Sequence, residues 1–153
     1  MFTNNKKVEG LDFDLLKKRL VDFEGLEKKL YFCKTNHPTI GVGRELSKNG
    51  ISEEEAMYLL DNDIHKVIEQ LDKQWEVWRT FPDAAKYVCI DVAFNMGINT
   101  WMSFRKTRAY MELGEWEKAA SEILDSKYSE QVGRRAIFNS EQLASCQKKP
   151  KSS

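Results

Sequence analysis

The stretch that decides the fold runs from Phe23 to Gly43 and reads FEGLEKKLYFCKTNHPTIGVG. An amphipathic helical pattern ends at its start, and two short runs of β-forming residues follow at 30–32 and 39–43. The residues between the two runs, KTNHP, are typical of a turn. This change of periodicity predicts a helix that leads into a small antiparallel β-lobe of two or three strands, over about residues 24–52.

The helix before the β-lobe is predicted over residues 12–24. Its apolar side chains recur at three- and four-residue spacing and form one stripe, made of Phe13, Leu16, Leu20 and Phe23. Asp12 is a suitable N-cap, and Gly25 is a suitable left-handed stop. Glu24 therefore projects from the C-terminus of the helix, where the helix dipole opposes ionisation of a carboxylate. A raised pKa at this position suits a proton donor.

Several helices are predicted after the β-lobe. Ser52 and Glu55 form a capping box that opens one long helix, which continues to about residue 78. Pro82 is well placed in the first turn of the next helix, which is strongly apolar. Three shorter helices follow, near 101–112, from Trp116 and from about Gly133. The pattern predicts an α+β protein that is mainly α-helical, with a flexible tail at 147–153.

Composition narrows the range of functions. The chain has 153 residues, which predicts one domain, and 24 Lys+Arg balance 24 Asp+Glu. A net charge of zero argues against nucleic-acid binding, which normally needs a strongly basic surface. The sequence has no apolar run long enough for a transmembrane helix, so no stable membrane insertion is expected. The start, MFTNNKKVEGLDFD, lacks the apolar core of a signal peptide.

The cysteines and histidines give no metal-site pattern. Cys33, Cys89 and Cys146 are odd in number and lack ligand spacing, which predicts reduced thiols. His37 and His65 are isolated in the sequence. We therefore expect neither a metal nor another cofactor.

Several segments resemble, in the same order, those of the phage T-four-type lysozymes, a family of cell-wall muramidases. Glu24, Cys33 and Thr39 stand at the spacing of that family's acid, its aspartate or cysteine, and its threonine. The later matching segments are Phe94-Asn95-Met96-Gly97, Ser103-Phe104, Gly114–Ala120 and Gln131–Ala136. The resemblance covers about residues 20–138. It implies a two-lobed, lysozyme-like single domain over 1–146, in which a long helix leads from the β-lobe to a larger helical lobe at 80–146.

The resemblance also implies a role for individual residues. Glu24 would be the general acid, which must stay protonated near neutral pH, so burial is expected. Thr39 would hold the nucleophilic water, and Arg135 would pair with the acid and tune it. Substrate-binding positions would be Asn95, Phe104, Gly41 and Gly43. An ion pair between Arg44 and Asp63 is also expected.

Cys33 stands where many members of that family have Asp. A thiol has a reference pKa of ~8.5, so it is mostly neutral at pH 7 unless its surroundings lower that value. Three roles stay open for it: positioning water together with Thr39, acting as a base when ionised, or attacking the anomeric carbon.

The sequence therefore predicts a bacteriolytic peptidoglycan hydrolase that cleaves the β-1,4 bond between N-acetylmuramic acid and N-acetylglucosamine. The expected setting is a monomeric phage-type endolysin, made in the host cytoplasm and acting on the cell wall. A bacterial or secreted toxin is the next expectation. The alternative from a different class is an inactive lysozyme-like module that binds peptidoglycan or serves a virion. A nucleic-acid adaptor using Arg134 and Arg135 is disfavoured by the net charge.

Overall fold

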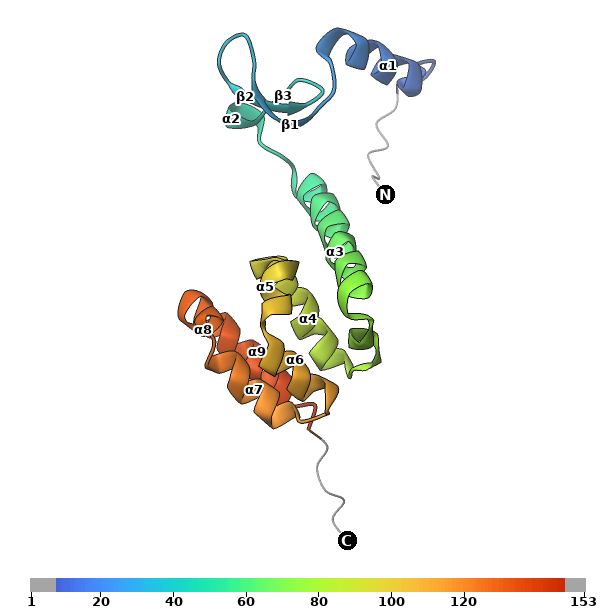
Figure 1. Ribbon diagram of the computed structural model, residues 1–153. Helices are drawn as coiled ribbons and strands as arrows, with labels where there is room; N and C mark the ends of the chain where they lie inside the picture. The colour runs from blue at the N-terminus through green and yellow to red at the C-terminus, as the bar shows by residue number, and fades with distance from the viewer. Residues whose placement is uncertain (1–7, 148–153) are drawn as a thin grey trace. The chain divides into compact units, whose positions relative to one another are not determined.

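The computed structural model describes residues 8–147, and Figure 1 labels its helices and strands. The chain divides into two compact units, Met1–Leu59 and Leu60–Ser153. The first unit holds the sheet and the second holds most of the helices, so the predicted mainly helical α+β class is confirmed. The tail predicted at 147–153 lies, from residue 148 on, outside the described residues.

The first unit begins with a helix and continues as a small sheet. Its elements are α1 (Phe13–Glu24), β1 (Glu27–Phe32), β2 (Pro38–Gly41), β3 (Arg44–Glu45) and the short helix α2 (Leu46–Asn49). Helix α1 starts as predicted, because the Asp12 carboxylate accepts hydrogen bonds from the backbone N–H groups of Asp14 and Leu15 at 3.0 and 3.1 Å. It stops at Gly25, which has a φ of +78°. No residue of α1 is buried.

The three strands are antiparallel in the order β1-β2-β3, which confirms the predicted β-lobe. Tyr31 lies opposite Thr39, and Thr39 lies opposite Glu45 on the other side. Thr39 is thus in the middle strand, and it is buried with 2% of its surface exposed. The register of β1 against β2 shifts between Glu27 and Tyr31.

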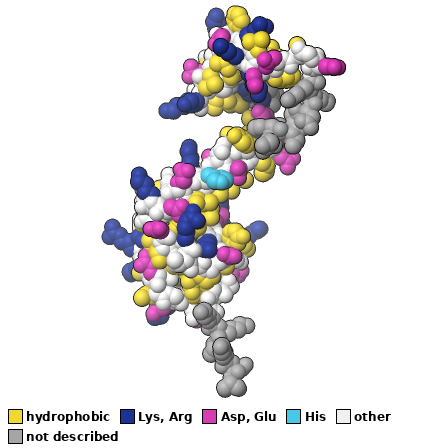
Figure 2. Space-filling model, turned by 90° about the vertical axis from the view of Figure 1, so that its right-hand side faces the viewer, with side chains coloured by type: hydrophobic (Ala, Val, Ile, Leu, Met, Phe, Trp, Pro, Cys, Tyr) yellow, Lys and Arg dark blue, Asp and Glu magenta, His cyan; other side chains and the backbone are white. Residues whose placement is uncertain are grey.

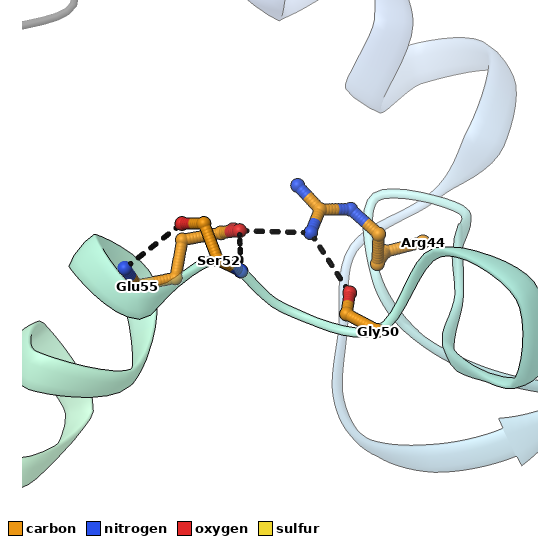
Figure 3. Close-up of polar contacts among 4 residues, drawn as sticks. All are labelled: Arg44, Gly50, Ser52 and Glu55. Carbon is orange, nitrogen blue, oxygen red and sulfur yellow. Dashed lines mark hydrogen bonds and ion pairs between the residues drawn. The ribbon is translucent and has the colours of Figure 1, made fainter.

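The long helix α3 spans Glu53–Trp75 and opens with the predicted capping box. The Ser52 backbone N–H donates to Glu55 at 2.9 Å, and the Glu55 backbone N–H donates to the Ser52 hydroxyl at 3.1 Å. Arg44 joins this box by donating to Glu55 Oε1 at 3.0 Å and to the Gly50 carbonyl at 3.2 Å (Figure 3). The carboxylate that pairs with Arg44 is therefore Glu55, which replaces the expected Asp63 because Glu55 sits at the helix start beside β3.

The second unit follows α3 as a succession of short helices. They are the 3₁₀-helix η1 (Glu76–Thr80), α4 (Asp83–Met96), α5 (Ile98–Ser103), α6 (Arg105–Glu112), α7 (Trp116–Leu124), α8 (Lys127–Val132) and α9 (Arg134–Ala144). The single helix predicted near 101–112 is two helices, because the backbone leaves helical geometry at Phe104, with φ −77° and ψ 61°. Helix α8 was not predicted, since it is only six residues long and carries no clear apolar period.

The core of the second unit is aromatic. Trp75, Trp101 and Phe81 form a chain of edge-to-face contacts, with ring centroids 5.2 and 5.8 Å apart. Trp101 is fully buried and Trp116 is 8% exposed, so both belong to the core. Helix α7 packs between α6 and α9 (Figure 1).

Candidate active site

Glu24 is the last residue of α1, and its carboxylate touches the loop after β2. A Cβ placed on Gly43 would lie 3.0 Å from Glu24 Oε2, so only a glycine lets the carboxylate approach this closely. Gly43 has a φ of +68°, and Gly41 has a similar φ of +71° but no atom within 4 Å of an added Cβ. Of these two glycines, only Gly43 is thus closely approached by another side chain. Glu24 is exposed within the first unit, so the prediction that this acid is buried is wrong there.

Cys33 follows β1 directly and begins the turn to β2. Its backbone N–H donates to the His37 carbonyl at 3.1 Å, which closes the turn. Asn36 adopts the left-handed conformation with φ +60°, which Asn tolerates better than most residues, and this reverses the chain. The Cys33 sulfur then lies 3.1 Å from the Thr35 hydroxyl oxygen.

The surroundings of the sulfur favour the thiolate. The pKa of Cys33 is lowered from its ordinary value to about 6, first by the hydrogen bond with the Thr35 hydroxyl and then by the backbone N–H of His37. Partial burial opposes this effect, while the backbone of Thr35 and the hydroxyl of Thr39 add smaller contributions. Cys33 is therefore mostly ionised at pH 7. Cys89, by contrast, is buried in the second unit, and burial raises its pKa.

Thr39 is directed towards the same turn from β2. Its hydroxyl donates to the His37 carbonyl at 2.9 Å, so the oxygen keeps its lone pairs for a further donor, such as a water molecule. Two of the three predicted catalytic residues, Cys33 and Thr39, are therefore brought together by the β1–β2 turn.

Sequence reasoning missed two residues of this turn, Thr35 and His37. The Thr35 hydroxyl oxygen lies 2.9 Å from Nδ1 of His37, while it also contacts the sulfur. The signal was available in the turn itself, because Cys33, Thr35 and His37 alternate, and alternate residues of a hairpin end can face the same side. From the sequence alone, KTNHP indicates only a turn, and His37 has no partner at ligand spacing.

Arg135 begins the second unit's last helix, α9, and is bound to α4. Its guanidinium donates to both oxygens of Asp91, at 2.9 and 2.6 Å, and Asn139 donates to the same carboxylate at 2.8 Å. Burial disfavours the charged form of Asp91, but the hydrogen bonds from Arg135 and Asn139 outweigh it and lower the pKa. Asn139 also donates to the buried hydroxyl of Tyr128 at 2.7 Å. The pairing of Arg135 with Glu24 stays a prediction.

The other two predicted substrate-binding residues also belong to the second unit. Asn95 is exposed near the C-terminal end of α4. Phe104 is half-buried between α5 and α6, and its ring packs against Trp101 and Tyr128 at centroid distances of 5.9 and 6.0 Å. Phe104 therefore contributes to the aromatic core, and one side of it lines a shallow pocket together with Arg105 and Glu122.

Residues 8–147 show neither a metal-binding cluster nor a membrane-spanning helix. Within 8–147, no cluster of three or more His, Cys, Asp or Glu side chains could hold a metal ion. No helix of that range is long and apolar enough to cross a membrane. Figure 2 shows Lys and Arg side chains interspersed with Asp and Glu on the face it presents, as expected from the balanced charge.

The chain is similar to a known protein family and to a curated phage protein. The profile of the family described as phage lysozyme matches residues 21–139. The pre-baseplate central spike protein Gp5 of Enterobacteria phage T4 is 28% identical over 141 residues. That alignment covers 74% of this chain but only 24% of Gp5, so the chain spans about a quarter of that relative. The family match includes the whole stretch from Glu24 to Thr39.

Proposed function

The chain belongs to the phage lysozyme family, and on that premise we propose that it is an active peptidoglycan hydrolase of the muramidase type. Its substrate is the β-1,4 bond between N-acetylmuramic acid and N-acetylglucosamine. The proposed setting is a monomeric endolysin, made in the cytoplasm of the host and bacteriolytic when it reaches the cell wall.

The observation that carries this proposal is the family match over residues 21–139, which includes Glu24, Cys33 and Thr39, together with the hydrogen bonding of the Cys33 sulfur. Glycosidases of the common two-carboxyl type need an acid and a second, negatively charged group. A neutral thiol could not fill the second position. The Cys33 sulfur is held beside a hydroxyl and two backbone N–H groups, and its pKa is lowered to about 6, so at neutral pH it carries the charge that an aspartate would carry.

The proposed roles follow from this charge. Glu24 protonates the glycosidic oxygen as the bond to the anomeric carbon breaks. The Cys33 thiolate takes a proton from a water molecule, and Thr39 accepts a hydrogen bond from that water because its own hydrogen is directed to the His37 carbonyl. This route inverts the anomeric carbon. Gly41 and Gly43 leave the strand end free of side chains where a sugar ring would pass.

A clearing assay tests the proposal. Wild type and Glu24→Gln are added to permeabilised Gram-negative cells, and the fall in turbidity is followed. We expect Glu24→Gln to lose at least about 100-fold in rate, which is the usual contribution of a general acid. Glu27→Gln is the matched control, because Glu27 is an exposed carboxylate three positions further on, at the start of β1. Equal clearing by wild type and Glu24→Gln would remove the acid role.

A second candidate function is supported by the similarity to the spike protein Gp5. In this alternative the domain is part of a virion or secretion apparatus and binds peptidoglycan without cleaving it. Co-sedimentation with purified sacculi separates the two. Retained binding by wild type, with no release of soluble fragments, would favour the binding module over the hydrolase.

A further inference from the structure

The β1–β2 turn holds a continuous chain of three side chains, two of which, Thr35 and His37, have no family-based role. The Cys33 sulfur lies 3.1 Å from the Thr35 hydroxyl oxygen, and that oxygen lies 2.9 Å from Nδ1 of His37. A hydroxyl can accept one hydrogen bond while it donates another. Thr35 is thus a bridge between a thiol and an imidazole, the side chain that most readily gains and loses a proton near neutral pH.

We propose that His37 is the proton acceptor of the Cys33 thiol, acting through the hydroxyl of Thr35. His37 and Thr35 are then positioning residues for the sulfur. Their use in catalysis rests on the proposed function, whereas the proton transfer itself does not.

The transfer balances without any further reactant. In the neutral state the thiol S–H donates to the Thr35 oxygen, and the Thr35 O–H donates to Nδ1 of His37. When the sulfur ionises, its proton moves to the Thr35 oxygen while the proton of Thr35 moves to Nδ1. The products are a thiolate and an imidazolium, with the threonine unchanged and both hydrogen bonds reversed. In the ionised state each bond is charge-assisted, and such bonds are stronger than neutral ones.

Nearby charged groups do not account for the ionisation of the sulfur. The groups that lower the Cys33 pKa are the hydroxyls of Thr35 and Thr39 and the backbone N–H groups of Thr35 and His37. The titratable side chains on this turn and on the strands and helix packed with it are Glu27, Lys28, Lys29, Tyr31, Lys34, Arg44, Glu45 and Lys48. None of these side chains is among the groups that shift the Cys33 pKa, and Arg44 is already paired with Glu55. The His37 imidazole is not among those groups either, so its assignment as proton acceptor rests on the hydrogen-bonded chain through Thr35.

Alkylation of Cys33 by iodoacetamide tests the relay without any cell-wall substrate, because only the thiolate reacts. The full chain is labelled for short times at pH 6 and pH 8, and peptide mass spectrometry reports Cys33 separately from Cys89 and Cys146. The variants are Thr35→Val, which removes the bridge, and His37→Asn, which keeps a polar group near the hydroxyl but cannot take up a proton. Thr35→Ser is the matched control, since it keeps the hydroxyl.

The relay predicts that the variants lose alkylation rate at Cys33 to an extent that depends on pH. At pH 6, Thr35→Val should react at least about tenfold more slowly than wild type, since it loses a hydrogen bond to a charged group. His37→Asn should react roughly three- to tenfold more slowly at pH 6, because the neighbouring positive charge is gone. At pH 8 the wild-type sulfur is already ionised, so both variants should come closer to the wild-type rate. Thr35→Ser should be alkylated at the wild-type rate at both pH 6 and pH 8.

Other outcomes overturn the relay. Wild-type rates for Thr35→Val and His37→Asn at pH 6 would show that neither residue controls the sulfur. An equal loss at pH 6 and pH 8 would show that the substitutions only change access or local structure. A pH-dependent loss combined with full cell clearing by Cys33→Ala would keep the relay and reject the proposed catalytic role of the sulfur.

The two histidines of the chain offer an independent readout by NMR. If the relay exists, the ring signals of His37 respond to ionisation of Cys33 in wild type and show a single simple titration in Cys33→Ser. His65 is the internal control, because its Nδ1 contacts the Asp61 carbonyl on α3 at 2.7 Å. Identical His37 titration curves in wild type and Cys33→Ser would contradict the coupling.

Discussion

The guanidinium of Arg135 binds both carboxylate oxygens of Asp91, and so ties the start of α9 to the middle of α4. The two residues are 44 positions apart in the sequence. Asn139, one turn further along α9, donates to the same carboxylate and also to the buried Tyr128 hydroxyl. A bidentate Arg–carboxylate pair that is supported by a buried amide is geometrically more specific and stronger than a surface ion pair.

Removal of Arg135 should destabilise the second unit. We expect Arg135→Gln to lower the free energy of unfolding by about 1–2 kcal/mol, since a carboxylate that is about two-thirds covered loses its charged donor. Urea unfolding at pH 7 measures the change. Arg134→Gln is the matched control, because Arg134 is its exposed sequence neighbour. Equal stability of the two variants would show that the pair with Asp91 contributes nothing.

Arg135 also has a predicted second role, the tuning of the catalytic acid. A nearby cation favours the ionised form of an acid, so its removal favours the protonated form that donates the proton. The alkaline limb of the pH–activity profile should therefore move to higher pH in Arg135→Gln. Asp91→Asn removes the carboxylate that would compete with Glu24 for Arg135. In this variant the alkaline limb of the pH–activity profile should therefore move to lower pH. Profiles that coincide with wild type would reject the tuning role.

The negative charge on Cys33 predicts how active its variants are in the clearing assay. Cys33→Ala should be nearly inactive in the clearing assay, whereas Cys33→Asp should keep substantial activity, because a carboxylate is anionic at pH 7. Analysis of the product's anomeric configuration then decides the role of the sulfur. Inversion is expected for a thiolate that activates water; retention would require a covalent intermediate on the enzyme.

Gly43 and Gly41 form a matched pair for testing the placement of Glu24. Both have φ near +70°, so Ala should cost about 1–2 kcal/mol of backbone strain at either position. Only at Gly43 does the new Cβ meet the Glu24 carboxylate, at 3.0 Å. Gly43→Ala should therefore lose more clearing activity than Gly41→Ala at similar stability. Equal activity of the two would mean that the position of the carboxylate does not matter.

The pair between Arg44 and Glu55 predicts a pH-dependent contribution to stability. Hydrogen bonds from Arg44 and Ser52 lower the pKa of Glu55 from 4.5 to about 2. Since the folded-state pKa is below the unfolded value, this contribution is fully present above about pH 4.5 and is lost as the pH falls through about 2. Glu55→Gln should have a lower free energy of unfolding than wild type at pH 7. The difference between the two should shrink as the pH falls from about 4.5 to about 2.

The control for this experiment is Glu53→Gln, which removes a carboxylate from the same first turn of α3. It changes the interaction with the helix dipole but not the capping box or the contact with Arg44. Urea unfolding at pH 7, 5, 3 and 2 gives the comparison. A difference between Glu55→Gln and wild type that stays constant down to pH 2 would contradict the assignment.

The features that could be predicted from sequence are those whose interactions lie within a few residues. The Asp12 cap, the Ser52–Glu55 capping box and the stop at Gly25 all depend on hydrogen bonds between near neighbours. The β-runs on either side of KTNHP are local in the same sense. The split at Phe104, by contrast, could not be predicted in this way, because it depends on packing against Trp101 and Tyr128.

The sequence by itself therefore determined where most helices and strands form, since backbone hydrogen bonds and apolar periodicity operate over short separations. Only the tertiary structure decided which side chains become partners. Arg44 binds Glu55 rather than Asp63, Arg135 binds Asp91, and the hairpin turn aligns Cys33, Thr35 and His37. Alternative polar partners differ little in free energy, so the choice among them is made by the packing that brings one of them within reach.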